Sequence, residues 1–242
     1  MQFYFIRHAQ SENNRRWLET GSHHRRDSDP ALTTLGWRQA GRLARFLEQP
    51  VTELGDFGTD YDPQNALGFG ITHIYCSLMV RSVATGTVLA QALDLPLVAW
   101  EDIHEIGGIH ARSEETDEHL GLPGRDRAYF EDHYPGLVLP DGLGDEGWWS
   151  RPFETYEERP LRAKRVLEDL WDGHGDTDHH VAVISHGGFY NHFMRVLLGL
   201  QQEEVPWFSL NNTAMTRIDF EEEGIWIQYT NRADYLPREM IT

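Results

Sequence analysis

The sequence predicts an α/β fold, a three-layer sandwich with a mostly parallel central sheet and helices on both faces. Short apolar runs, typical of buried strands, alternate along the chain with segments of helical spacing. Three of these runs lead directly into polar residues: Arg7-His8, the segment 77–81, and Ser185-His186. In such sheets active groups lie at the carboxyl ends of the strands, so we expect these residues to meet at one rim.

The expected strands are short, and the last two form an antiparallel hairpin. They cover residues 2–6, 71–76, 97–100, 181–185, 213–220 and 225–230. The expected helices run from Thr33 or Thr34 towards Pro50 and over 82–93, 156–172 and 189–198. A threonine hydroxyl can cap the first helix, a proline ends it, and Gly199 is a natural end for the last.

Residues 107–152 have a different composition from the rest of the chain. They are rich in Gly, Pro, acidic and aromatic residues and show no long helical period. We expect this segment to be an inserted cap lying over the carboxyl rim of the sheet. The 242 residues are then a single domain, 1–242, with the cap as its insertion.

The formal net charge of -18 is unevenly distributed. Residues 1–48 hold eight Arg against five acidic residues, whereas residues 101–160 hold sixteen acidic residues against five Arg. Clustered basic residues are absent from the sequence, which argues against a nucleic-acid partner. No apolar run approaches the roughly 18–20 residues of a membrane span, so we expect no membrane partner. With a single cysteine, Cys76, and no secretory signal, the expected location is cytoplasmic.

The residues expected at the rim suit the chemistry of a phosphoryl group. A neutral imidazole, from His8 or His186, is a competent nucleophile towards phosphorus. The guanidinium groups of Arg7 and Arg81 bind phosphate oxygens in forked pairs and offset developing charge. The glycines after His186 would let backbone N–H groups at a helix start face the anion. A carboxyl group is still needed to protonate the leaving oxygen, and Glu105 is the candidate.

These residues resemble the motifs of a known family, the histidine phosphatase superfamily, also called phosphoglycerate mutase-like. Its Arg-His-Gly-x-Ser signature is similar to Arg7-His8-Ala9-Gln10-Ser11, with Ala9 in place of the usual Gly. The other matching motifs are the segment 32–40, the segment 77–85, Ser185-His186-Gly187-Gly188, and Asn212-Thr213 before the strand that begins at 214. They occur in the right order over nearly the whole chain.

The resemblance implies a covalent two-step transfer. His8 would attack phosphorus and form a phosphohistidine, while Arg7, Arg81, His186 and Asn14 hold the phosphoryl oxygens, with Gly187 beside them. Glu105 would protonate the leaving alcohol and then activate the water that releases phosphate. We expect no metal and no organic cofactor, because Arg and His supply the positive charge.

Departures from the family pattern favour a phosphatase over a mutase. Glu105 is followed by Ile106-Gly107-Gly108 rather than by a basic, aromatic stretch, and the cap lacks an adjacent Arg pair. The acid phosphatase and phytase pattern, with a second Arg after the first motif, is also absent. The sequence therefore predicts a phosphomonoesterase acting on a small phosphorylated metabolite. The alternatives are a phosphoglycerate-mutase-type phosphotransferase and a non-catalytic protein that binds a phosphorylated ligand, and the oligomeric state stays open.

Two pairs of adjacent histidines, His23-His24 and His179-His180, raise the question of a metal site. Such pairs on polar loops are usually surface residues, and no carboxylate at ligand spacing repeats beside them. We expect no metal site.

Overall fold

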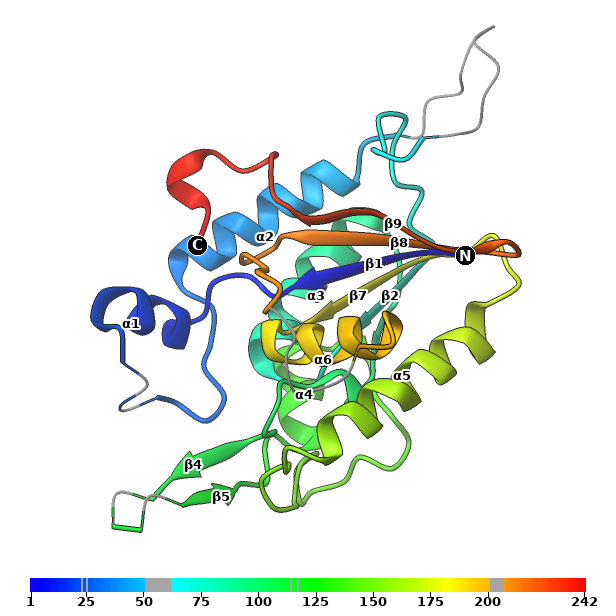
Figure 1. Ribbon diagram of the computed structural model, residues 1–242. Coiled ribbons are helices and arrows are strands. Elements are labelled where there is room, and N and C mark those ends of the chain that lie inside the picture. Colours follow the sequence, from blue (N-terminus) through cyan, green and yellow to red (C-terminus); the bar gives the residue numbers. More distant parts are fainter. Residues whose placement is uncertain (23, 25, 51–61, 114, 117, 201–206) are drawn as a thin grey trace, which may run out of the picture.

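The computed structural model describes the chain except for residues 23, 25, 51–61, 114, 117 and 201–206. Its centre is a seven-stranded sheet in the order β6-β3-β2-β7-β1-β8-β9. Figure 1 shows β2, β7, β1, β8 and β9 side by side. These strands are β1 (Gln2–Arg7), β2 (His73–Cys76), β3 (Leu97–Ala99), β6 (Leu137–Val138), β7 (His180–Ser185), β8 (Met215–Glu221) and β9 (Gly224–Arg232). The pairs from β6 to β1 are parallel, whereas β8 is antiparallel to both β1 and β9. The predicted mostly parallel sheet is confirmed.

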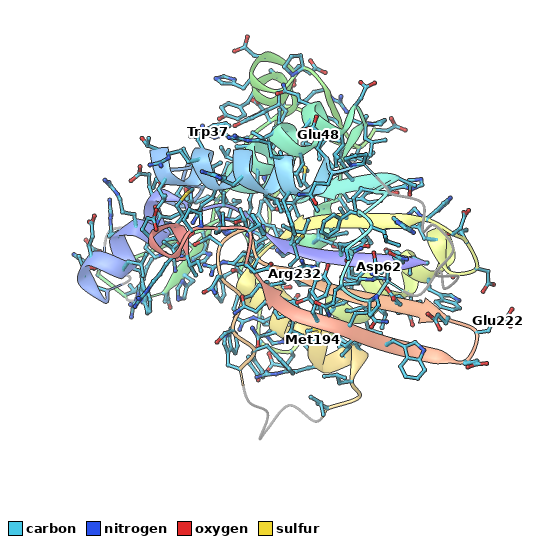
Figure 2. The ribbon with its side chains drawn as sticks, turned by 90° about the horizontal axis from the view of Figure 1, so that it is seen from above. Trp37, Glu48, Asp62, Met194, Glu222 and Arg232 are labelled. Atoms are coloured by element: carbon cyan, nitrogen blue, oxygen red, sulfur yellow. The ribbon has the colours of Figure 1, made fainter. Side chains whose placement is uncertain are left out.

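Helices cover both faces of the sheet. They are α1 (Glu12–Thr20), α2 (Thr34–Leu47), α3 (Val80–Leu93), α4 (Arg127–His133), α5 (Glu158–His174) and α6 (Gly187–Leu197), with 3-10 turns η1 (Glu101–Ile103) and η2 (Arg238–Met240). Figure 2, seen from above, places α2, with Trp37 and Glu48, on one side of the sheet and α6, with Met194, on the other. None of the helices in the described part of the chain is long and apolar enough to cross a membrane.

Alternation of side chains along β1 connects the sheet to both helical layers, because successive residues of a strand point to opposite faces. Tyr4 and Ile6 pack in one buried cluster with residues of α2, α3 and α4. Phe3 and Phe5 pack in the other with residues of α5 and α6. Burying β1 on both faces makes it the centre of the core, and this fixes where the residues after it emerge.

The segment 107–152 contains more regular structure than its composition predicts. It holds a two-stranded ribbon, β4 (His110–Arg112) with β5 (His119–Gly121), and helix α4. It also returns to the sheet, because Leu137–Val138 pairs with β3 as the edge strand β6. Within the segment, Trp149 lies so close to Gly108 that a Cβ atom at position 108 would overlap the indole ring.

Candidate active site

His8 and His186 follow two neighbouring parallel strands in the same register. Arg7 pairs with Ser185, so the next residue of each chain segment leaves the sheet at the same level. The N–H of His8 donates to the carbonyl of Ser185 at 2.9 Å. The two imidazole centroids are 5.0 Å apart, and both residues are almost fully buried. The structure thus brings the two predicted histidines together at the carboxyl rim.

The hydrogen bonds of His8 assign its free nitrogen. Nδ1 lies 2.7 Å from the carbonyl oxygen of Ala9, which can only accept, so Nδ1 carries the proton. Nε2 then has a lone pair, and the Nε–H of Arg81 donates to it at 3.1 Å. Burial, and next the charges of Arg81 and Arg7, hold the pKa of His8 well below its usual range. The ring is therefore a neutral nucleophile with Nε2 as its reactive atom.

Arg81 lies in the first turn of α3, where it is held from several sides. Its Nη2 contacts the sulfur of Met79 at 3.0 Å, and its Nη1 lies 3.7 Å from a carboxylate oxygen of Asp29. That oxygen also accepts the N–H of Val80 at 3.0 Å. Burial nevertheless raises the pKa of Asp29 to about 6, with Arg81 opposing the rise. Asp29 thus fixes both the helix start and the guanidinium that faces His8.

His186 is oriented by Ser77, the residue that follows β2. The Ser77 hydroxyl accepts the N–H of Met79 at 3.4 Å and lies 2.6 Å from Nε2 of His186, to which it can donate its one proton. Nδ1 of His186 would then carry the one N–H proton of the neutral ring, and Nδ1 has no hydrogen-bond partner among the described residues. Burial, and next the charge of Arg81, hold the pKa of His186 well below its usual range.

Arg7 supplies a second buried donor without a partner. Its Nη1 donates to the carbonyl of Leu210 at 2.6 Å, while its Nε has no partner within the described part of the chain. Burial lowers the pKa of Arg7 to about 10, against the attraction of Glu105, so the group stays charged at neutral pH. A Cβ at Gly187 would lie 3.7 Å from this Nε, an ordinary contact. The donors of Arg7 and His186 that lack protein acceptors are those an anionic group would satisfy.

The side chain of Glu105 lies at the N-terminus of α6. This differs from the expected arrangement, in which the backbone N–H groups of the glycine pair face the anion. The carboxylate of Glu105 accepts N–H groups from Gly188 at 3.2 Å and from Phe189 at 2.9 Å. The amide of Gly188 therefore faces Glu105 rather than an external anion. A Cβ at Gly188 would overlap Oε1 of Glu105, which explains the need for glycine at this position. Glu105 interacts electrostatically with both Arg7 and Arg81, which places it at the same site.

The side-chain oxygen of Asn14 already accepts hydrogen bonds from neighbouring residues of the protein. Ser11 and Asn14 form a reciprocal capping box at the start of α1, with Asn14 Oδ1 accepting from the Ser11 backbone and hydroxyl. Asn212 donates to the same oxygen at 3.2 Å and to the carbonyl of His8 at 2.8 Å. Asn14 is therefore tied to the His8 loop, and only its amide N–H groups are available to a phosphoryl oxygen.

The loop that carries Glu105 rests on a buried ion pair from α5. Nε and Nη2 of Arg162 donate to Glu154 at 2.6 and 2.9 Å, and Nη1 donates to the carbonyls of Asp102 and His104. Glu154 also accepts the N–H of Gly107 at 3.1 Å. The pair thus contacts the loop on both sides of Glu105.

Several residues of the site were not assigned roles from the sequence. Ser77 and Asn212 lie inside motifs that resemble those of the family. Their place in these motifs is the sequence signal that could identify them as site residues. Asp29, Arg162 and Glu154 act through contacts between residues distant in the sequence or in irregular segments, and they carry no local pattern. Every predicted site residue lies at or next to the carboxyl rim, with Asn14 and Gly187 at its margin.

Comparison with known proteins agrees with this geometry. A model of the histidine phosphatase superfamily (branch 1) matches residues 64–233. The putative phosphoserine phosphatase 2 of Hydrogenobacter thermophilus is 26% identical over 239 residues, 96% of this chain and 95% of that protein. The probable phosphoglycerate mutase GpmB of Yersinia pestis is 23% identical over 186 residues, 77% of this chain and 80% of that protein.

Solved structures share the fold over nearly the whole chain. A phosphoserine phosphatase mutant from Entamoeba histolytica, in complex with phosphoserine, matches with a TM-score of 0.59 at 19% identity, covering 98% of this chain and 99% of that one. A mycobacterial glucosyl-3-phosphoglycerate phosphatase matches with a TM-score of 0.57 at 16% identity, covering 96% and 99%. Since the family model matches well over half of the chain, this protein belongs to the histidine phosphatase superfamily (branch 1) and is an enzyme of the phosphatase type.

Proposed function

We propose that the protein hydrolyses a monophosphate ester of a small metabolite through a phosphohistidine on Nε2 of His8. The observation that carries this proposal is the hydrogen-bonding state of the two histidines. His8 presents a lone pair at Nε2, whereas Nδ1 of His186 has no partner among the described residues and carries the ring proton when Ser77 donates to Nε2. A nucleophile and a donor 5.0 Å apart between ring centroids suit a phosphoryl group placed between them.

In the first step Nε2 of His8 attacks phosphorus and the bond to the ester oxygen breaks. Arg81 exchanges its contact with Nε2 for a phosphoryl oxygen, and Arg7 and His186 donate to the others. Glu105 in its acid form gives its proton to the leaving alcohol. The phosphorylated ring still carries its Nδ1 proton, and its positive charge is stabilised by the Ala9 carbonyl at 2.7 Å.

In the second step Glu105, now a carboxylate, accepts a proton from water. The resulting hydroxide attacks phosphorus, the P–N bond breaks, and His8 returns to its neutral form. Inorganic phosphate leaves, and Glu105 has regained the proton that it gave up. The guanidinium groups of Arg7 and Arg81 supply the positive charge, so the proposed transfer uses neither a metal ion nor an organic cofactor.

Phosphoserine and 3-phosphoglycerate are the first substrates to test. The named relatives include phosphoserine phosphatases, one of them in complex with phosphoserine, a probable phosphoglycerate mutase and a glucosyl-3-phosphoglycerate phosphatase. These compounds are phosphate esters of small carboxylic acids. They support a small phosphorylated metabolite as the partner of this site.

Phosphate release from an aryl phosphate and from a panel of metabolite monophosphates, with a chelator present, tests the proposal. Wild-type protein should release phosphate, and His8→Ala should lower kcat by at least about 1,000-fold because the nucleophile is lost. Equal turnover by the two proteins would refute the role of His8.

A phosphotransferase of the mutase type is the second candidate, favoured by the similarity to the GpmB protein of Yersinia pestis. It would move the phosphoryl group between the hydroxyls of phosphoglycerate instead of releasing it to water. Analysis of the products separates the two activities. Binding of a phosphorylated ligand with neither product formed would instead indicate a non-catalytic protein.

A further inference from the structure

Three histidines meet at the end of the sheet opposite to His8 and His186. His73 begins β2, His174 ends α5, and His179 lies directly before β7. His73 pairs in register with Val181, five residues before His186. At about 3.3 Å per residue along a strand, the cluster is about 16 Å from the catalytic rim.

The three rings converge closely. Their centroids lie 4.3 Å (His73 to His179), 4.8 Å (His73 to His174) and 5.1 Å (His174 to His179) apart. One nitrogen from each ring can be chosen so that all three lie within 4.8 Å of one another. Nδ1 of His174 and Nδ1 of His179 are hydrogen-bonded at 2.9 Å, a contact that an ion bound to both nitrogens would replace.

We propose that His73, His174 and His179 form a binding site for a divalent transition-metal ion, with Zn²⁺ as the expected occupant. Nitrogens bound to one tetrahedral Zn²⁺ at about 2.0–2.1 Å are about 3.4 Å apart, so small ring rotations bring this cluster to ligand geometry. The site lies apart from the phosphoryl-transfer machinery and does not depend on it. It also revises the expectation that His179 is an ordinary surface residue.

Neighbouring hydroxyl groups contact two of the rings, and metal-bound histidines usually have an oxygen partner at the nitrogen that does not bind the metal. Nδ1 of His73 lies 2.8 Å from the Thr72 hydroxyl, which leaves Nε2 for an ion. Nε2 of His174 lies 3.1 Å from the Tyr75 hydroxyl, which leaves Nδ1. Each of these rings can donate its one proton to oxygen and direct the other nitrogen to the metal.

The donor set selects the class of ion. Imidazole nitrogens suit Zn²⁺, Cu²⁺, Ni²⁺ and Co²⁺, whereas Mg²⁺ and Ca²⁺ prefer oxygen ligands. Three protein ligands leave a fourth coordination position of a tetrahedral ion for water.

Titration of the full-length protein with Co²⁺ after chelator treatment tests the site. We expect one ion per chain with the visible absorption of tetrahedral Co²⁺, displaced by Zn²⁺ but not by Mg²⁺. His73→Gln and His179→Gln should each weaken binding by at least about tenfold. At a hundredfold excess over its Kd, Zn²⁺ should raise the unfolding midpoint of wild type by about 5–10 °C.

His119→Gln is the matched control, since His119 and His110 form another close pair of rings, 4.9 Å apart. The absorption should persist in His119→Gln and in His8→Ala. Its persistence in His73→Gln and His179→Gln, or its loss in either control, would overturn the proposal. The unfolding midpoints of the metal-free variants show whether each variant is folded, and His73→Gln alone serves as the test if His179→Gln is not folded.

Discussion

At the scale of single residues, the two histidines of the site differ in which ring nitrogen carries the proton. The Ala9 carbonyl fixes the proton of His8 on Nδ1 and leaves Nε2 as a nucleophile. Ser77 engages Nε2 of His186 and leaves Nδ1 as the donor. Two imidazoles of the same burial thus take opposite roles because their oxygen neighbours differ.

Glu105 is the residue whose role is tested by the choice of leaving group. Glu105→Gln keeps one side-chain oxygen, which can accept from the amide of Phe189, while its NH2 group replaces the oxygen that accepts from Gly188. The amide side chain cannot give up a proton in acid catalysis. Alkyl phosphates, whose leaving oxygen needs protonation, should lose about 100–10,000-fold in kcat. Aryl phosphates, with better leaving groups, should lose far less. Steady-state rates on one substrate of each kind check this, and equal losses would count against Glu105 as the proton donor.

At the scale of elements, α5 acts on the site without touching the reacting atoms. Arg162 connects this helix to the carbonyls on either side of Ile103 and to Glu154, which accepts from Gly107. We therefore assign Arg162 a positioning role for Glu105. A substitution of Arg162 should therefore change the ratio of alkyl phosphate to aryl phosphate turnover, the same ratio that depends on Glu105.

Arg162→Met should lower turnover of alkyl phosphates more than of aryl phosphates, because the Glu105 loop loses its support. It should also cost about 3–5 kcal/mol of stability, since Glu154 is left buried and unpaired. Adding Glu154→Gln removes that charge and should restore part of the stability but not the substrate ratio. Lys164→Met is the control, because Lys164 lies on the same helix in an exposed pair with Glu168. An unchanged substrate ratio in Arg162→Met would contradict the positioning role.

The elements that the sequence predicts well are those with an apolar period. The four expected helices and the strands of the sheet centre appear within about three residues of their expected ends. Helix α1 is not among the expected helices, because Asn13 is its one buried residue and no apolar stripe marks it. Strand β6 is two residues long and depends on β3 for its pairing, so nothing local identifies it.

The residues of the site also fall into two groups, those that the sequence locates and those that it does not. Arg7, His8, Arg81 and His186 follow or flank strands and could be located from the sequence. The partners that fix their protons and charges could not, because Asp29 meets Arg81 across 52 positions of the chain. The three-histidine cluster is similar, since His73 and His179 are distant in sequence and adjacent only once β2 and β7 pair.

At the scale of the whole molecule, buried neutral histidines make the fold sensitive to acid. Burial holds the pKa values of His8, His104 and His186 well below 6.5 and lowers that of His192 to about 4. In the unfolded chain these rings bind protons near pH 6.5, so the unfolded state takes up more protons. The free energy of unfolding should fall as the pH drops below about 6.5, by up to about 1.4 kcal/mol per pH unit for each ring.

Urea unfolding at pH 7.5, 6.0 and 5.0 measures this dependence. Asp29 acts in the opposite sense, because burial raises its pKa to about 6, but it is one group against several. His192→Gln removes one ring and should reduce the slope between pH 5 and 6 by up to about 1.4 kcal/mol per pH unit. A free energy of unfolding that does not change between pH 7.5 and 5.0 would contradict the expected uptake of protons.

The shared register of β1 and β7 also governs which sequence changes the enzyme can tolerate. His8 and His186 are neighbours because Arg7 pairs with Ser185, so the 5.0 Å between their rings is close to the spacing of adjacent strands. Exchanging one apolar residue of β1 for another alters packing and leaves that spacing intact. Inserting or deleting one residue in β1 would turn the histidine to the opposite face of the sheet. The length of this strand is therefore a stricter requirement for activity than its composition.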